Sequence, residues 1–553
     1  MISQLPRSLT QLELHNCLLP FNPDDTRDDA AALHSTFVDH AYLKLNAPTT
    51  TSSEIMANHP EIKKLAMIGC GSMGGGMALL FAENGCEVSL QDPSNEAMDK
   101  VIEQGKKDRV PSKISKYSDY KSLCESLDDT KVFVWSLPHG HVGDSVLDGL
   151  MPYLKRGDII IDAANEHWQN TERRIGKCHP KGIRYVGMGV SGGYQAARRG
   201  PSMCPGSDSE SLDIVLPLLK KAAAKAPDGS PCVGKIGTGG AGHYCKMIHN
   251  GIEHGMMSAI CEAWGIMERG LGMSLDEIGA ELHRWNKSGE LQGTFLVRIG
   301  ADICLTKDGK GNRVLDSVED KVVQDFTGEE GTGIWSNTEA VMHHVPAPTL
   351  TSAHYLRLAS GDRHQRTTVK KTFGSDYPPQ KLSVQDKKQF LEDLRMAVYG
   401  ACLASYVQGM NIIDKADKEN HFNVDYYQLL QIWRAGCIIQ ADYISSKLLM
   451  PIYKNYAKKQ AKNPLYEPDV AADLKKSFTP LKKIVLQAAE KDHPVPSLSA
   501  TFEYLKYQTS TNLPTSFYEA ELDYFGKHMY DRKDDDVAGL PTTGKYHFEW
   551  KPA

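Results

Sequence analysis

The sequence has little charge of one sign and no long apolar run, and each absence excludes a class of protein. Its formal net charge is −6 over 553 residues, so no basic field would attract a nucleic acid. No segment reaches the roughly 20 apolar residues that cross a bilayer, and the N-terminus does not resemble a secretion signal. We therefore expect a cytoplasmic protein that binds neither nucleic acid nor membrane.

Paired cysteines are also lacking. The 12 cysteines are scattered between Cys17 and Cys437, without a CxxC pair or a spacing typical of metal ligands. This usage is typical of reduced thiols in an intracellular enzyme rather than of a disulfide framework. A chain of 553 residues is too long for one ordinary core, so we expect two or three domains and a small-molecule ligand.

Short apolar runs alternate with helical stretches in the first part of the chain. The strand-like runs lie at 65–68, 87–90, 132–135, 159–161 and 184–190. This alternation predicts a parallel, doubly wound sheet. It ends at the glycine cluster 237–242. Long stretches of helical composition then follow at 244–270, 385–412 and 426–447.

These patterns predict an α/β domain followed by an all-α domain. We expect a flexible extension at 1–60, a Rossmann-type dinucleotide-binding domain at 61–238 and a large helical domain at 239–500. Residues 501–553 mix aromatic and polar residues without helical periodicity, which predicts an extended C-terminal tail. Segments 305–330 and 360–382 are expected to be loops.

A glycine-rich segment follows the first expected strand and leads into a helical run. Glycines there allow a tight turn and a close approach of the backbone to a pyrophosphate, which the positive end of the helix also attracts. The alternative is a purely structural turn. The residues expected to bind a dinucleotide are Gly69, Gly71, Ser72, Met73 and Gly74.

Asp92 ends the second expected strand, where an acidic residue can hydrogen-bond the adenosine ribose. A carboxylate there would repel a 2′-phosphate, so NAD is favoured as the cofactor and NADP stays possible. Asp92 is equally well explained as the first residue of an Asp-Pro-Ser turn.

Four polar residues share one face of the helix expected after the glycine cluster. Lys246, His249, Asn250 and Glu253 have the spacing i, i+3, i+4 and i+7. The stripe is explained either by a proton-transfer site or by a solvated face with a Lys–Glu pair. His249 and Glu253 could also share a metal ion, but no third ligand is apparent nearby, so we expect no metal.

Several longer segments resemble 6-phosphogluconate dehydrogenase. The stretch GVSGGYQAARRGPSMCPG at 189–206 is similar to the substrate loop of that family, and GHYCKMIHNGIEHG at 242–255 is similar to its catalytic helix. IWRAGCII at 432–439 and DYFGKHMY at 523–530 are also similar to family segments. The resemblance spans residues 62–535. It implies a homodimer, built through the helical domain, in which the tail reaches the partner subunit.

The resemblance implies an oxidative decarboxylation of a sugar acid. The C3 hydroxyl is oxidised by the nicotinamide, C1 leaves as carbon dioxide, and the enediol is then protonated. Lys246 would be the general base on the hydroxyl and afterwards the proton donor to the ketone oxygen. Glu253 would return a proton to C1 of the enediol, which is the former C2 of the acid.

The resemblance also implies the residues that hold the substrate. The matching positions are Asn165, Ser191, Gly192, Gly193, His249 and Asn250. Ser191 and the two glycines would hold the carboxylate, and Asn165 would also contact the cofactor. From the residues alone, the glycine pair can also be explained as a tight strand exit, and Asn165 can also be explained as a helix cap.

The family's phosphate-binding positions are altered in this chain. A tyrosine, a lysine and a tail arginine are replaced by His254, Ile334 and Leu522, whereas Arg363 and His528 are matched to a second arginine and a tail histidine. Because charge-assisted hydrogen bonds contribute about 1.5–3 kcal/mol each, we expect a weaker dependence on a terminal phosphate. His254, Arg363 and His528 remain candidates for that end of the substrate.

Two other functions stay open. A 3-hydroxyacid dehydrogenase without decarboxylation would release no carbon dioxide, and a noncatalytic cofactor-binding homologue would show no turnover. The polar stripe argues against the second. Pro93 and Ser94 also replace an Arg-Thr pair that commonly recognises the 2′-phosphate of NADP, the usual cofactor of the family.

Overall fold

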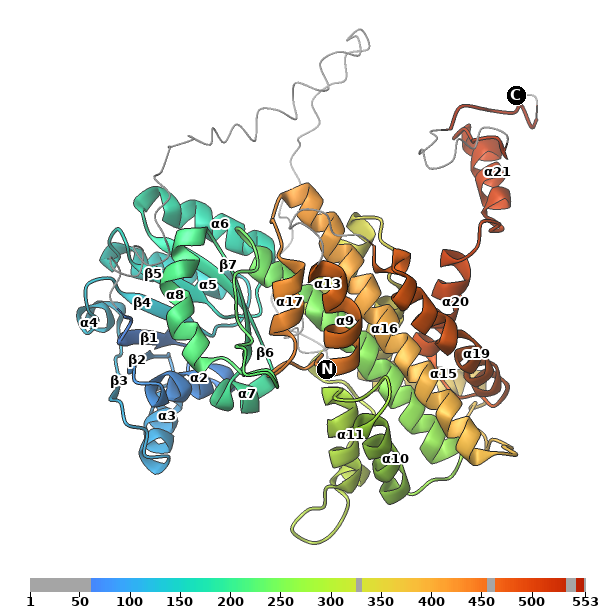
Figure 1. Cartoon of the computed structure of the whole chain (residues 1–553), viewed down its shortest axis with the longest axis horizontal. Coiled ribbons are helices and arrows are strands. Elements are labelled where there is room, and N and C mark those ends of the chain that lie inside the picture. Colours follow the sequence, from blue (N-terminus) through green and yellow to red (C-terminus); the bar gives the residue numbers. More distant parts are fainter. Residues whose placement is uncertain (1–60, 325–330, 455–462, 534–543, 552–553) are drawn as a thin grey trace, which may run out of the picture. The chain divides into compact units, whose positions relative to one another are not determined.

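Figure 1 shows the computed structural model of the chain, which describes residues 61–324, 331–454, 463–533 and 544–551. The extension predicted at 1–60 lies outside the described residues. The predicted boundary at 238/239 falls between the last strand and the long helix that begins at Ala241. The predicted boundary at 500/501 falls inside a helix, Pro496–Gln508.

The first part of the described chain contains a seven-stranded sheet in the order β3-β2-β1-β4-β5-β6-β7. Its strands are β1 (Lys64–Ile68), β2 (Glu87–Gln91), β3 (Ile114–Lys116), β4 (Val132–Trp135), β5 (Ile159–Asp162), β6 (Arg184–Ser191) and β7 (Ser202–Gly206). All five predicted strands are confirmed. The sequence analysis missed β3, which is short and half-buried, and β7, which runs antiparallel to β6 and contains Pro205.

Helices cover both faces of this sheet, as the doubly wound prediction requires. They are α2 (Ser72–Glu83), α3 (Asn95–Lys107), α4 (Tyr120–Glu125), α5 (His141–Leu150), α6 (Trp168–Cys178), α7 (Gly193–Arg199) and α8 (Ser209–Ala222). Leu65 and Met67 of β1 belong to the apolar cluster that holds α2, α3 and α8. The alternate residues Ala66 and Ile68 belong to the cluster that holds α4 and α5, because successive side chains of a strand point to opposite faces.

The remaining elements are helical, as predicted. They are α9 (Ala241–Gly265), α10 (Leu275–Lys287), α11 (Phe295–Leu305), α13 (Thr332–Met342), α14 (Pro348–Gly361), α15 (Arg363–Phe373), α16 (Lys387–Asn420), α17 (Tyr426–Ile432), α18 (Met450–Lys454), α19 (Pro468–Glu490), α20 (Pro496–Gln508) and α21 (Thr515–Gly526). The core forms where α9 packs against α13, α14 and α16. The residues predicted to be catalytic lie on this central helix, α9, which also contacts β6 and β7.

Helix α16 is long and apolar enough to cross a membrane, by length and composition alone. Its most apolar window has a mean hydropathy of 1.2, but 94% of that window is buried inside the protein. We predicted no membrane-spanning segment from the sequence, because charged residues interrupt both ends of this apolar run. The side chains of α16 pack instead against α9 and α19.

Three predictions about the second half were wrong. The stretch 426–447 is not one helix, because the chain turns after α17 at Gly436, whose φ is 62°. The loop predicted at 360–382 contains α15, which Asp362 caps at its N-terminus and Gly374 ends with a φ of 65°. The tail contains α21, where a helix buries only Asp523 and so shows no apolar periodicity.

Candidate active site

The predicted dinucleotide loop joins β1 to α2. Gly69 has a φ of 91°, and a Cβ on Gly74 would come within 1.9 Å of its carbonyl oxygen, so neither position tolerates a side chain. A Cβ on Gly71 would meet nothing within 4 Å, and no side chain caps the first turn formed by Ser72 and Met73. The loop is thus tight inside and open at the helix N-terminus, which fits a bound dinucleotide phosphate.

Asp92 ties the end of β2 to this loop. Its Oδ2 accepts the backbone N–H of Cys70 at 2.7 Å, and its Oδ1 accepts the N–H of Ser94 at 2.8 Å. The bond to Ser94 is the one expected for an Asp-Pro-Ser turn, which is the alternative role of Asp92. The first bond holds a carboxylate against the glycine loop.

Two glycines allow α9 to approach the sheet closely. A Cβ on Gly242 would lie 2.2 Å from the backbone oxygen of Gly187, and a Cβ on Gly189 would lie 2.3 Å from Cβ of Lys246. Helix α9 therefore packs directly on β6 and β7. This contact brings Lys246 to the carboxyl end of β6, where Ser191 is the last residue.

The polar stripe of α9 is buried rather than solvated. Lys246, His249 and Asn250 are 8%, 1% and 9% exposed. The Lys246 Nζ donates to Asn250 Oδ1 at 2.7 Å, and His249 Nδ1 lies 2.9 Å from the same oxygen. The Asn250 side-chain amide donates to Thr332 Oγ1 at 2.8 Å. Buried polar groups cost free energy unless they are paired, so these hydrogen bonds hold the three buried side chains in place.

The hydrogen bonds fix the tautomer of His249. Asn250 Oδ1 can only accept, so the Nδ1 of His249 carries the proton. Burial, reinforced by the charge of Lys246, holds the pKa of His249 well below its usual value, so the ring is neutral and Nε2 is an acceptor. That nitrogen lies 2.9 Å from Ser191 Oγ and 3.1 Å from Cys437 Sγ.

The glycines that follow Ser191 form the tight strand exit that the sequence allowed, and their role toward a carboxylate stays a prediction. Gly192 has a φ of 108°, and a Cβ there would lie 2.4 Å from the backbone oxygen of Gly436, so it forms a tight strand exit. Gly193 has open space where a Cβ would be. The Ser191 hydroxyl accepts the N–H of Ile438 at 3.3 Å. The open side at Gly193 leaves room for a ligand beside Ser191.

Glu253 lies at the edge of the network, and no contact places Asn165 in it. The Oε2 of Glu253 is 3.8 Å from His249 Nδ1, and its side chain is 22% exposed. Asn165 is exposed in the loop after β5, and no hydrogen bond within the described residues joins it to the network. It does not cap α6, because the cap is His167. The helix-cap alternative for Asn165 is therefore wrong.

The structure does not bring Arg363 to the site. Arg363 begins α15 and forms a surface ion pair with Glu319. The arginine at the end of the stripe is Arg357, whose guanidinium contacts Nε2 of His254. The ring of His254 also stacks on that of His354. The available sequence signal was the i, i+3 spacing of His354 and Arg357, which places both on one face of α14.

The tail positions stay apart from this network in the described chain. His528 packs beside Phe525 of α21, with ring centroids 5.9 Å apart. Leu522 also lies on α21. Ile334, in the first turn of α13, is 53% exposed. The partner-subunit role of His528 stays a prediction. No group of three or more potential metal ligands occurs among the described residues.

Thr332 and Cys437 are site residues that the sequence analysis missed. Thr332 orients Asn250, and Cys437 contacts His249. Thr332 lies two residues before Ile334, and Cys437 lies within the family-like segment IWRAGCII. A threonine or cysteine carries no pattern of its own, so only the fold identifies these contacts.

Two family models together match nearly all of the described chain. The NAD binding domain of 6-phosphogluconate dehydrogenase matches residues 64–237. The C-terminal domain of 6-phosphogluconate dehydrogenase matches residues 242–550. The junction between the two matches lies at the glycine cluster before α9.

Individual relatives match over the same length. The decarboxylating 6-phosphogluconate dehydrogenase of Emericella nidulans is 42% identical over 498 residues, which cover 87% of this chain and 100% of the relative. The Escherichia coli (strain K12) enzyme of the same name is 35% identical and covers 88% of this chain. The structure of Plasmodium falciparum 6-phosphogluconate dehydrogenase, described with NADP+ and 6-phosphogluconate, matches 88% of this chain with a TM-score of 0.78 and 31% identity. This chain therefore belongs to the 6-phosphogluconate dehydrogenase family.

Proposed function

We propose that this protein oxidises and decarboxylates 6-phosphogluconate to a ketose phosphate, with NAD(P) as the hydride acceptor. The observation that carries the proposal is the buried network of Lys246, His249, Asn250 and Ser191. It lies at the carboxyl end of the sheet, where ligands bind in doubly wound folds. Family membership supplies the reaction, and the network supplies the groups that the reaction needs.

Lys246 is the proton carrier of the oxidation step. The bound nicotinamide would take a hydride from C3, so the C3 hydroxyl must lose its proton at the same time. Lys246 Nζ, held by Asn250 Oδ1 at 2.7 Å, takes that proton in its neutral form. It then returns the proton to the ketone oxygen as the C1–C2 bond breaks and carbon dioxide leaves.

The neighbours of Lys246 orient the substrate. Neutral His249 and Asn250 hold the C3 hydroxyl, and Ser191 with the open backbone at Gly193 holds the carboxylate. Asn165 contacts both substrate and cofactor from the loop after β5. Glu253 protonates the enediol carbon that was C2 of the acid, while the enol hydroxyl returns its proton to Lys246. Being 22% exposed, Glu253 can regain its proton from solvent.

NAD is the proposed cofactor. Asp92 is held against the glycine loop by its bond to the N–H of Cys70, and its charge disfavours a 2′-phosphate nearby. Pro93 and Ser94 offer no cation in compensation. The relative from Plasmodium falciparum is described with NADP+, so the two cofactors must be compared directly.

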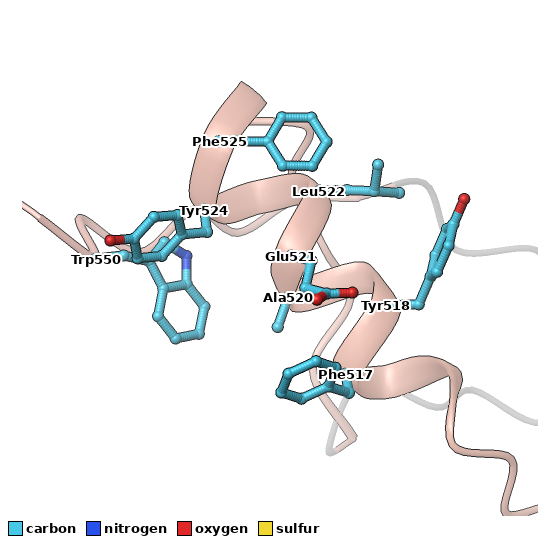
Figure 2. Close-up of a pocket in the computed structure, with 8 residues that line it drawn as sticks. All are labelled: Phe517, Tyr518, Ala520, Glu521, Leu522, Tyr524, Phe525 and Trp550. Carbon is cyan, nitrogen blue, oxygen red and sulfur yellow. The ribbon is translucent and has the colours of Figure 1, made fainter.

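A homodimer is proposed on the basis of the tail. Figure 2 shows the aromatic side chains of α21 and Trp550 around an open pocket. Phe517 and Phe525 are each 72% exposed, although apolar side chains of this size are usually buried. Asp523 anchors the last residues on α21, accepting hydrogen bonds from His547 and Trp550. The partner subunit would cover this face, and His528 would reach the partner's substrate site.

The weaker dependence on a terminal phosphate is retained as part of the proposal. Ile334 and Leu522 supply no charge where the family has cations. Both would lower the cost of burying an uncharged end of a related aldonic acid. A cytoplasmic location also stays a prediction.

A panel of phosphorylated and unphosphorylated aldonic acids, assayed with NAD and with NADP, tests the function. We expect reduction of the cofactor with 6-phosphogluconate, together with release of carbon dioxide. Reduction without carbon dioxide would establish the 3-hydroxyacid dehydrogenase instead. Cofactor binding without turnover of any acid would establish the noncatalytic homologue.

A further inference from the structure

A buried arginine on α6 joins three carboxylates behind the loops that follow β4 and β5. The Nη1 of Arg174 donates to Glu166 Oε2 at 2.8 Å and to Asp162 Oδ2 at 3.2 Å, and its Nε donates to Asp144 Oδ1 at 3.2 Å. Arg174, Asp162 and Glu166 are 0%, 1% and 2% exposed. Because apolar residues in place of a buried ion pair are often as stable or more so, stability alone does not account for these charges.

The arginine and Glu166 fix the loop after β4 through Gly140. Arg174 Nη2 donates to the carbonyl oxygen of Gly140 at 2.6 Å, and Glu166 Oε2 accepts the N–H of Gly140 at 3.0 Å. A Cβ on Gly143, in the first turn of α5, would lie 2.6 Å from Cζ of Arg174, so the guanidinium fills the space against that turn. Both polar backbone groups of Gly140 are thus bound by one ion pair.

The same cluster fixes the loop after β5 on both sides of Asn165. Asp162, the last residue of β5, accepts the N–H of Ala164 at 3.1 Å. Glu166 accepts the N–H of His167 at 2.8 Å. Asn165 lies between these two bonds and is itself exposed. Its side chain therefore extends from a backbone that is held immediately before it and after it.

Both loops lie at the edge of the sheet that contains the proposed dinucleotide site. Strand β4 stands next to β1, and β5 stands next to β4, all parallel. The two loops therefore leave the sheet at the same carboxyl edge as the glycine loop, where ligands bind in doubly wound folds. The ion pair of Glu166 and Arg174 sets how these loops stand relative to each other.

We propose that Glu166 and Arg174 are positioning residues, whose ion pair holds Asn165 in the orientation that contacts both the nicotinamide and the substrate. The inference rests on the proposed function, because Asn165 takes its role from that reaction. In this role both residues act through the backbone rather than by contact with a ligand. A displacement of about 1 Å at a reacting centre can cost on the order of 10² in rate, so a loosened loop should lower kcat.

Glu166→Gln tests the ion pair with little change in size. The amide keeps an oxygen that can accept an N–H, but it lacks the charge that pairs with Arg174. We expect kcat with 6-phosphogluconate to fall by about tenfold or more. The dinucleotide dissociation constant, measured by calorimetry, should stay within about threefold, because the glycine loop is a separate element. Arg173→Gln is the control on the same helix, since the Arg173 side chain is 46% exposed, and it should leave kcat unchanged.

A double-mutant cycle with Asn165→Ala separates positioning from a general loss of structure. If Glu166 acts through Asn165, then Glu166→Gln should change kcat by less than about twofold once the Asn165 side chain has been removed. Affinity for 6-phosphogluconate, measured by calorimetry, should show the same coupling without any need for turnover. Arg174→Lys keeps the charge but not the planar fork. It enters the same cycle, and replaces Glu166→Gln if that variant does not fold.

Equal factors in the two backgrounds, or an unchanged kcat in both Glu166→Gln and Arg174→Lys, overturn the inference. These outcomes are separate from failure of the proposed function. Coupling in the affinity for 6-phosphogluconate, with no turnover by either cofactor, would refute the function and leave the positioning role. Turnover with release of carbon dioxide but equal factors would refute the inference alone. A protein that does not bind 6-phosphogluconate would refute both.

Discussion

At the residue scale, the proposed mechanism assigns both proton transfers to a single lysine. Lys246→Met removes the base and leaves a side chain of similar length, so we expect kcat to fall by a factor on the order of 10³ or more. Dinucleotide binding, measured by calorimetry, should stay within about twofold, because the glycine loop lies on a different element. Lys235→Met is a matched control, since Lys235 forms an ion pair with Asp213 at the surface. Near-normal kcat in Lys246→Met contradicts the assignment.

At the same scale, we propose that Asp92 determines cofactor choice. Asp92→Asn keeps a hydrogen-bond acceptor for the N–H of Cys70 but removes the negative charge. The ratio of kcat/KM for NAD to that for NADP should therefore fall by about tenfold. Asp99→Asn, an exposed carboxylate on α3 paired with Lys116, should leave the ratio unchanged. An NADP preference in the unmodified protein would show that Asp92 acts only as the first residue of the Asp-Pro-Ser turn.

At the scale of elements, Glu262 joins α9 to α20. Its carboxylate accepts the N–H groups of Ser497 and Leu498, each at 2.9 Å, in the first turn of α20. Burial nevertheless raises its pKa from 4.5 to about 7, against those hydrogen bonds. The folded state thus binds the proton more tightly than the unfolded state does. The stability from this site is complete below pH 4.5 and is lost as pH rises through about 7.

We therefore expect the free energy of unfolding to contain a contribution of roughly 3 kcal/mol that disappears between those two pH values. Glu262→Gln should remove that part of the pH dependence, because its side chain does not ionise. Urea unfolding at fixed protein concentration and several pH values measures it, with exposed Glu103→Gln as the control. An unchanged pH profile in Glu262→Gln would argue against a protonated carboxyl at this position.

Elements differ in how well the sequence predicts them. The strands β1, β2, β4, β5 and β6 were predictable because each is a buried apolar run between helical segments, and the network on α9 because its spacing fits a helix. Strand β7 was not predictable, because Ser202 and Pro205 interrupt its apolar pattern. Its pairing with β6 also depends on the tertiary structure. Arg357 was passed over for Arg363 because only the packing of α14 against α9 decides which arginine faces His254.

At the scale of the whole molecule, the exposed aromatic face of α21 is the basis of the proposed homodimer. We expect sedimentation to show a dimer. Replacing Phe517 and Phe525 with serine should raise the dimer dissociation constant by about tenfold or more, because each removes about 1.5–3 kcal/mol of apolar burial. Phe373→Ser, which changes an equally exposed aromatic on α15, is the control. A monomeric unmodified protein would remove the basis for the tail's proposed role.

Oxidative decarboxylation is tested most directly by the ratio of carbon dioxide released to cofactor reduced. With 6-phosphogluconate as substrate, both products should form in equal amounts throughout the reaction, because the proposed mechanism couples oxidation at C3 to the loss of C1 as carbon dioxide. Cofactor reduction with no accompanying carbon dioxide, or no reduction of either NAD or NADP, would contradict it.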